Sequence, residues 1–246
     1  MTACFEYPRQ TNFGRIVPKD KIYTNANVST ALKNRFIDQV ERITWAHKLA
    51  PETLNLTATK SVPEIEIIRI RCKQAELHQD VLKAIDKAIP FPLIFELVYN
   101  AKRKMVAGYK RPSEADSSKW VTSSYFNSDW EEKDAPRQPL PQAIDLGKLY
   151  EAMLVKLMPD FENSAEPAVL NEGMSDMQQA IYDAPIPMPQ RVARVEEILA
   201  QEREIDRIKS RLGRTRQFNK RVEINGELRD AMQELENMKR KERTSH

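Results

Sequence analysis

Five basic side chains between Tyr99 and Arg111 have the type and spacing needed to contact phosphate groups. No acidic residue interrupts this segment, which also contains Tyr99 and Tyr109. Because cationic side chains neutralise phosphates and aromatic rings stack on bases, the segment predicts a nucleic-acid interface on a β-hairpin. The alternative is a solvated turn whose lysines protect a sheet edge from aggregation. The basic residues are Lys102, Arg103, Lys104, Lys110 and Arg111.

A second concentration of positive charge lies between Arg203 and Arg221. It holds eight basic residues against Glu204 and Asp206, a net charge of +6. In a helical hairpin these charges would gather at and beside the turn, where they favour binding of phosphate or of an acidic protein surface. A merely solvated charged face is the alternative. The candidate nucleic-acid-binding residues here are Arg211, Arg214, Arg216, Lys220 and Arg221.

Other kinds of chemistry lack the residues that they need. The six glycines, at positions 14, 108, 147, 173, 213 and 226, are too scattered for a phosphate-binding loop. No His or Cys pair has the short spacing of a zinc site, and no G-x-S-x-G nucleophile motif occurs. We expect His47 to be a packed core histidine and Cys72 a buried hydrophobe. We therefore predict no catalytic residue, no metal and no cofactor.

One enzymatic alternative is a divergent Mg²⁺-dependent nuclease, in which carboxylates on neighbouring strands hold the metal and a lysine polarises the attacking water. The candidates are Glu64 and Glu66 on one expected strand and Glu96 on another. Such a site needs a carboxylate and a lysine two residues apart, whereas these strands carry the tripeptides EIE and ELV. We interpret the three carboxylates as solvent-facing charges on alternating strands.

Composition narrows the class of protein further. Lys and Arg number 39 and Asp and Glu 36, so the formal net charge of +3 excludes a globally basic, histone-like protein. No apolar run approaches the roughly 18–20 residues that span a bilayer, so we expect no membrane partner. Two cysteines are too few for a disulfide framework, which favours a reducing cytoplasm.

Residues 1–183 are expected to form an α/β body, because every aromatic residue except Phe218 lies at or before Tyr182. Apolar periodicity predicts helices over 30–49, 77–89 and 145–158, and a shorter helical piece around 174–181. Alternation and β-branched residues predict strands over 64–72, 92–100, 104–110 and 119–126, with a turn at 100–103. The predicted fold class is α+β (α/β), a mixed or antiparallel sheet with packed helices, followed by a C-terminal helical hairpin.

Prolines at 185, 187 and 189 predict an extended linker over 184–190, between the body and the tail. Residues 191–246 hold 15 basic and 11 acidic residues and carry two apolar stripes at helical spacing. One stripe is not stable on an isolated helix, so these helices must pair with each other, with the body or with another chain. The apolar residues expected to contact a partner are Ile198, Ile205, Leu212, Phe218, Val222, Leu228 and Leu235.

Several segments of the chain stand in the order that characterises one known family. They are KDKIY near Lys21, VERITWAHKLAPETLNL from Val40, EIEIIRI from Glu64, IDKAIPFPLIFEL from Ile85, YKR at Tyr109, YFNSDW from Tyr125 and QFNKRVEINGELR from Gln217. On these segments the chain resembles the bacterial domain-of-unknown-function family 4391 over nearly its whole length. The resemblance implies no site residue. It implies a setting beside helicases and DNA methyltransferases in restriction or antiviral defence clusters.

These features together predict a non-enzymatic interaction or adaptor subunit of a bacterial DNA-targeting assembly. The resemblance implies that its protein partner is a helicase or DNA methyltransferase of the same system, and the tail helices would make the contact. The alternatives are a direct nucleic-acid-binding protein that uses the basic segments 102–111 and 203–221, and the Mg²⁺-dependent nuclease.

Overall fold

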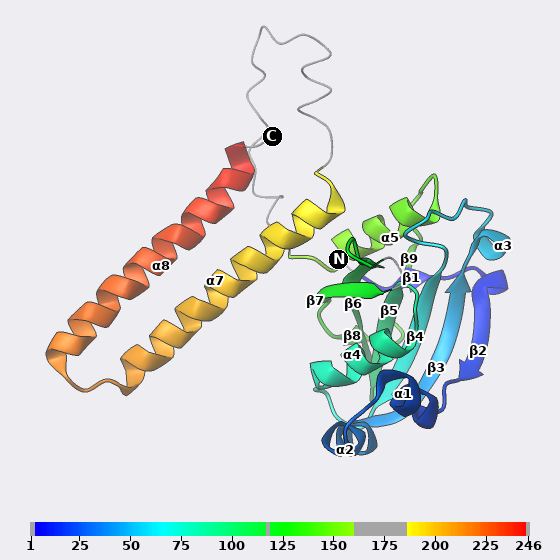
Figure 1. The fold of residues 1–246 in the computed structure, drawn as a ribbon, viewed down its shortest axis with the longest axis horizontal. Helices are drawn as coiled ribbons and strands as arrows, with labels where there is room; N and C mark the ends of the chain where they lie inside the picture. Colours follow the sequence, from blue (N-terminus) through cyan, green and yellow to red (C-terminus); the bar gives the residue numbers. More distant parts are fainter. Residues whose placement is uncertain (1–2, 117–118, 160–185, 245–246) are drawn as a thin grey trace, which may run out of the picture. The chain divides into compact units, whose positions relative to one another are not determined.

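The computed structural model describes residues 3–116, 119–159 and 186–244, which belong to two compact units (Figure 1). The first unit, Met1–Met158, is a body of helices and strands, and the second, Pro159–His246, contains two long helices. The predicted fold class, a mixed sheet with packed helices followed by a helical pair, is confirmed. The short helix expected around residues 174–181 lies outside the described residues.

A seven-stranded mixed sheet forms the centre of the body. Its main path has the order β2-β3-β4-β5-β6-β7, and β8 pairs with β6. Strands β4 and β5 are parallel, whereas the other pairs described in this sheet are antiparallel. The strands are β2 (Asn12–Ile16), β3 (Val40–Leu49), β4 (Ile65–Cys72), β5 (Leu93–Tyr99), β6 (Lys102–Pro112), β7 (Trp120–Asn127) and β8 (Glu131–Glu132).

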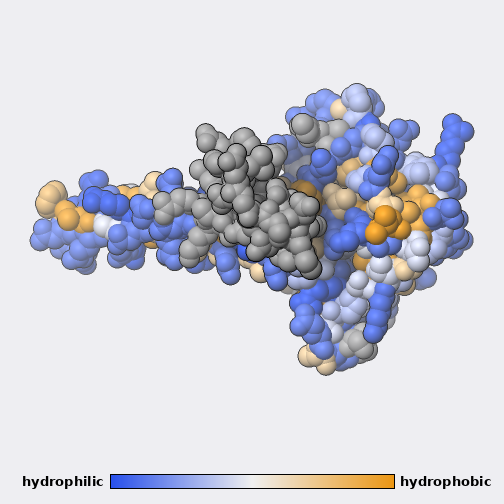
Figure 2. Space-filling model, turned by 90° about the horizontal axis from the view of Figure 1, so that it is seen from above, coloured by the Kyte–Doolittle hydropathy of each residue, from blue (hydrophilic) through white to orange (hydrophobic). Residues whose placement is uncertain are grey.

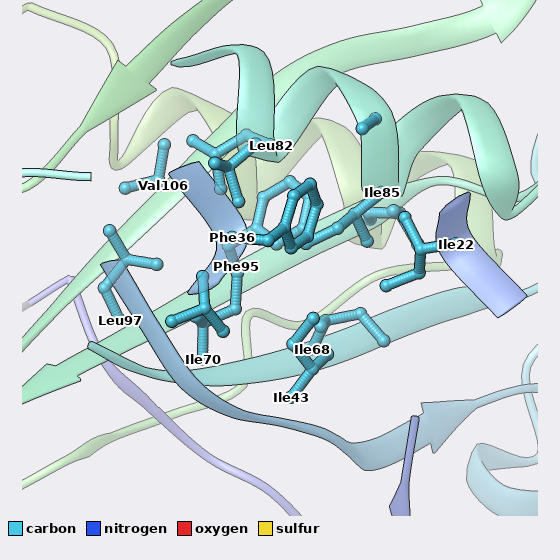
Figure 3. Close-up of a cluster of buried hydrophobic side chains, with 14 of the residues drawn as sticks. Ile22, Phe36, Ile43, Ile68, Ile70, Leu82, Ile85, Phe95, Leu97 and Val106 are labelled. Atoms are coloured by element: carbon cyan, nitrogen blue, oxygen red, sulfur yellow. The ribbon is translucent and has the colours of Figure 1, made fainter. Parts of the chain in front are cut away.

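Three helices cover one face of this sheet and form the main hydrophobic core with it. In Figure 3, Ile22, Phe36 and Ile85 from these helices gather with Ile68 and Phe95 from the central strands. The last of the three helices connects the parallel strands β4 and β5, which cannot be joined by a tight turn. The helices are α1 (Lys19–Ala26), α2 (Thr30–Gln39) and α4 (Gln79–Ala88).

Helix α5 (Leu146–Val155) covers the opposite face. Neighbouring side chains on a strand point to opposite faces, and on β6 Lys110 reaches Asp86 of α4 while Tyr109 stacks on Tyr150 of α5. Helices therefore pack on both faces of the sheet, with α5 lying against β6 on the second face. The remaining short elements are β1 (Phe5–Glu6), which pairs in parallel with β9 (Gln138–Pro139), η1 (Arg9–Thr11) and α3 (Pro51–Leu54).

The helix predicted over residues 30–49 is wrong in its second half. Val40 has extended backbone angles (φ −111°, ψ 118°), and Val40–Leu49 is strand β3, paired with β4. Irregularities in that pairing, between Val40 and Arg42 and between Trp45 and His47, interrupt the usual alternation of buried and exposed residues. Buried residues consequently recur every third position, which imitates a helix. They are Val40, Ile43, Ala46 and Leu49.

The other predicted elements of the body agree with the structure in type and approximate position. The expected strands correspond to β4, β5, β6 and β7, and the expected helices over 77–89 and 145–158 to α4 and α5. The predicted turn over 100–103 is shorter, because Tyr99 already pairs with Lys102 and Asn100 has the positive φ of 51° that suits a two-residue hairpin turn. The predictions lack α1, where only Ile22 and Ala26 are buried, too few for a periodic stripe.

The second unit contains an antiparallel pair of helices, α7 (Met188–Arg214) and α8 (Phe218–Thr244), each 27 residues long. Thr215 ends α7, because its amide donates to the Leu212 carbonyl and its hydroxyl to the Arg211 carbonyl.

The linker predicted over 184–190 is wrong at 188–190, which are helical; a proline is tolerated in the first turn, where no amide donor is required. No helix in the described parts of the chain is long and apolar enough to cross a membrane.

Candidate functional site

The two long helices hold each other through a narrow apolar seam. On α8 the seam residues follow intervals of four and three, the spacing at which two packed helices meet. Most of them remain half-buried, because one neighbouring helix cannot cover a whole stripe. The seam consists of Val195, Ile198, Ile205 and Ile208 on α7, and of Ile224, Leu228, Ala231, Leu235 and Met238 on α8.

Two ion pairs across the seam are consistent with its antiparallel register. Lys239 pairs with Glu202 at 2.8 Å, and Arg211 pairs with Glu227 nearer the turn. All four side chains are at least a third exposed, so each pair contributes at most about 1 kcal/mol to stability. Their main effect is to fix which residues face each other.

A groove of about 1,010 Å³ lies along one side of the seam. Its apolar residues are Ile205, Leu228, Met232 and Leu235, and its charged residues are Lys209, Arg229, Glu236 and Lys239. Met232 is 51% exposed, so the groove offers apolar surface that the hairpin itself does not cover. The charges sum to +2. An apolar strip between two helices, bordered by charges, has the form of a groove that accepts an amphipathic helix.

The residues predicted to contact a partner fall into separate groups in the structure. Ile198 is buried in the seam and Ile205 lies in the seam at the edge of the groove, so they hold the hairpin together. Leu212 is half-buried near the turn. Phe218 and Val222 are 78% and 56% exposed and do not line the groove. The other two, Leu228 and Leu235, do line it.

The predicted contact residues do not include Met232, although it lies four positions after Leu228, at helical spacing. Its exposure and its place in the groove make it the most accessible apolar contact there.

The turn between the helices presents exposed positive charge. The basic turn comprises Arg211, Arg214, Arg216, Lys220 and Arg221, all exposed. Arg211 pairs with Glu227, whereas the other four have no acidic partner within the described part of the chain. Figure 2 shows the helical pair as mainly hydrophilic, with apolar atoms at one end. The sequence-predicted charge cluster is therefore present at this surface.

The basic segment of the body does not form the predicted patch. Arg103 is 2% exposed, pairs with Glu131 at 2.7 Å and donates to the carbonyl oxygens of Lys133 and Ala135. Lys110 is 1% exposed. Both cations are directed into the protein, so they are unavailable to a phosphate on the surface. This corrects the prediction for these two residues.

The other three basic residues of that segment remain nearer the surface. Lys102 is exposed. The Lys104 ammonium lies 5.0 Å from the centroid of the Trp130 ring, and Arg111 pairs with Glu114 at 3.0 Å.

Lys110 belongs to a buried polar network between the sheet and α4. Its ammonium donates to the Asp86 carboxylate at 3.2 Å and to the backbone oxygens of Asp86 and Ile89 at 2.5 and 2.6 Å. The Tyr125 hydroxyl donates to the other carboxylate oxygen of Asp86. Burial raises the pKa of Asp86 above its usual range, although the charge of Lys110 opposes this shift. The network therefore fixes α4 against β6 and β7.

The carboxylates considered for a nuclease are not solvent-facing, contrary to the prediction. Glu96 is buried between Arg69 at 3.1 Å and Arg137 at 2.6 Å; burial alone would raise its pKa, but the two guanidinium groups lower it. Arg137 also donates to the carbonyl oxygen of Phe5, so this cluster attaches β1 to the sheet.

Glu66 is completely buried and accepts a hydrogen bond from the Trp45 indole, while its other carboxyl oxygen has no partner. Burial is the main cause that raises the pKa of Glu66 to about 9, and the neighbouring Glu64 raises it further. Glu64 in turn pairs with Lys48 at 2.8 Å. Two carboxyl groups and a lysine thus meet, but Glu66 is a neutral acid at pH 7 and a poor Mg²⁺ ligand. The described residues contain no group of three or more His, Cys, Asp or Glu suited to a metal.

The remaining ionisable candidates are packed in the body. His47 lies on β3, its ring 4.6 Å from that of Tyr7 and its Nδ1 3.0 Å from the Thr11 hydroxyl. Burial, with the nearby Arg69, lowers the pKa of His47 to about 4, so the imidazole is neutral. Burial also raises the pKa of the Cys72 thiol to about 11, which leaves it protonated and unreactive.

The model of the family described as Domain of unknown function (DUF4391) matches residues 5–235. The chain belongs to this family. The matched range includes the body and the hairpin as far as Leu235, so both units belong to the DUF4391 pattern. No curated protein and no solved structure matches the chain.

Replacement of Lys110 by methionine tests whether this residue is structural. The variant leaves Asp86 buried without its cation, so Lys110→Met should lower the free energy of unfolding by about 3–5 kcal/mol. Lys102→Met, on the same strand but exposed, should change it by about 0.5 kcal/mol or less. Urea unfolding measures both. Equal stability of the two variants would contradict the buried network.

Replacement of Glu66 by glutamine tests its protonation. Folded Glu66 keeps its proton up to about pH 9, whereas the unfolded chain releases it above about pH 4.5, so its contribution to stability falls as pH rises through that window. Glutamine does not titrate, so Glu66→Gln should remove this fall in the free energy of unfolding, which is at most about 1.4 kcal/mol per pH unit. The advantage of the variant over the unmodified chain should grow with pH in denaturant titrations. A difference that is constant with pH, as expected for the exposed control Glu76→Gln, would show that Glu66 is ionised when folded.

Proposed function

We propose that this protein is a non-enzymatic interaction subunit whose helical hairpin binds a partner protein by accepting an amphipathic helix. The observation that carries the proposal is the groove beside the seam, where Leu228, Met232 and Leu235 stay partly uncovered. Burial of such a strip against a partner helix would stabilise a complex without disturbing the seam that holds α7 to α8.

The charges of the groove support a partner helix with acidic flanks. Lys209 and Lys239 pair with Asp206 and Glu202, which do not line the groove, whereas Arg229 has no acidic partner among the described residues. Arg229 is therefore the cation that a carboxylate of the partner would meet, and complementary charge favours association and fixes register. The α8 residues that line the groove run from Asn225 to Lys239, which corresponds to about 21 Å of helix. A partner segment of about four helical turns would fill it.

The cellular setting of the proposal comes from the sequence resemblance. A helicase or a DNA methyltransferase of the same DNA-targeting system is the class of partner that we propose. The body would then serve as a folded platform attached to the hairpin, since its buried charges support its own packing.

Affinity purification of the tagged full chain from its native host, with quantitative mass spectrometry, tests the groove. Met232→Asp places a carboxylate where an apolar partner surface should pack, so recovery of the specific partner should fall at least about tenfold. Val222→Asp is the matched control, because Val222 lies on the same helix with similar exposure but outside the groove.

Circular dichroism would verify that both variants keep their helices. A partner recovered equally well with Met232→Asp, or lost only with Val222→Asp, would contradict docking in the groove.

Direct nucleic-acid binding through the basic turn is a second candidate function. Arg214, Arg216, Lys220 and Arg221 are exposed and lack acidic partners in the described structure, which is the observation that favours it. Affinity for DNA or RNA should then fall steeply with salt, with a slope of about 0.7–0.9 for each phosphate neutralised.

The double variant Arg214→Glu/Lys220→Glu should reduce that slope in gel-shift titrations, whereas Lys83→Glu/Lys87→Glu, on the exposed side of α4, should leave it unchanged. Absence of binding at low salt, or equal slopes for the two double variants, would refute this function.

A further inference from the structure

A depression of about 350 Å³ opens in the body beside the turn between β5 and β6. Its size lies within the range of about 300–1,000 Å³ that is typical of small-molecule sites. Two aromatic rings, two alanines, one amide and one lysine form its lining. They are Ala75, Tyr99, Asn100, Ala101, Lys102 and Trp130.

The aromatic walls of this depression are held by the core. Tyr99 and Trp130 both pack against the main hydrophobic cluster, and both remain partly exposed. The Lys104 ammonium over the Trp130 ring further restrains that side chain. The depression thus combines supported ring faces with small alanine side chains, which leave room for a flat ligand.

Its two polar side chains are available to a ligand. The amide of Asn100 makes no hydrogen bond within the described residues, and an amide offers the donor and the acceptor that a base edge requires. Lys102 is exposed and forms no ion pair in the described structure, even with Glu132, its pairing neighbour on β8. No acidic residue lines the depression.

We propose that this depression binds a nucleotide, with the base against Tyr99 and Trp130, Asn100 at the base edge and Lys102 at the phosphate. Base–aromatic stacking is tolerant of sequence, and a single cation suits one phosphate. A free mononucleotide and one residue of a single strand present this same chemistry. An aromatic side chain of a protein would fill similar space but would leave Lys102 without a counter-charge.

Calorimetric titration of the full chain with AMP, adenosine and a short oligo(dA) tests the site. AMP should bind more tightly than adenosine, and Lys102→Ala should weaken AMP about tenfold while leaving adenosine unchanged. Lys83→Ala, an exposed lysine on α4, is the matched control and should have no effect. Trp130→Ala should weaken all three ligands, and Trp130→Phe should restore most of the stacking.

The oligonucleotide separates the two sources of the ligand. Tighter binding of oligo(dA) than of AMP identifies a single strand, and equal or weaker binding identifies a free nucleotide; both results support the site. Absence of saturable binding of AMP and oligo(dA), or AMP binding that Lys102→Ala leaves unchanged, would overturn the proposal. Because Lys102 is exposed, that variant keeps the fold, and neither result bears on the hairpin groove.

Discussion

Two helices packed side by side can cover one stripe of each other, and this constraint governs the hairpin. The isoleucines of α7 are buried against α8. Among the described residues of this unit α8 packs on α7, and Leu228 and Leu235 remain half-buried while Met232 is exposed. A third helix is the natural way to bury such a strip. The seam thus holds α7 and α8 together, while the groove beside it keeps exposed apolar surface. For this reason we assign partner binding to the groove.

Several charged residues of the body are buried, whereas those of the hairpin turn are exposed. Arg103, Lys110 and Glu96 are almost fully buried, and each is neutralised by a partner within the body. Breaking one partner of such a pair leaves an uncompensated buried charge, so these residues constrain the fold strongly. The same arrangement removes them from the surface. Positive charge that remains exposed is found at the basic turn and at scattered lysines such as Lys102.

Local patterns in the sequence were sufficient for much of the fold, but not for the features that depend on contacts between distant residues. The apolar strand at 92–100 and the two tail helices follow from short-range periodicity. The sequence of β3 predicts a helix because irregular pairing with β4 spaces its buried side chains like those of a helix. The burial of Lys110 depends on Asp86, 24 positions earlier, and no local pattern signals that contact. Similarly, helical spacing alone places Phe218 with the groove residues Leu228 and Leu235, although Phe218 is exposed outside the groove. The position of α7 decides which apolar residues of α8 line the groove, and spacing along α8 does not contain that information.

The chemistry of the groove can be measured directly with synthetic peptides. We suggest fluorescence anisotropy of the full chain with a labelled amphipathic helix of about four turns, carrying leucines on one face and glutamates beside it, against the same peptide with lysines. The account predicts saturable binding of the glutamate peptide, at least about tenfold tighter than the lysine peptide and weakened by Met232→Asp. Equal or tighter binding of the lysine peptide, or no binding of either, would contradict it.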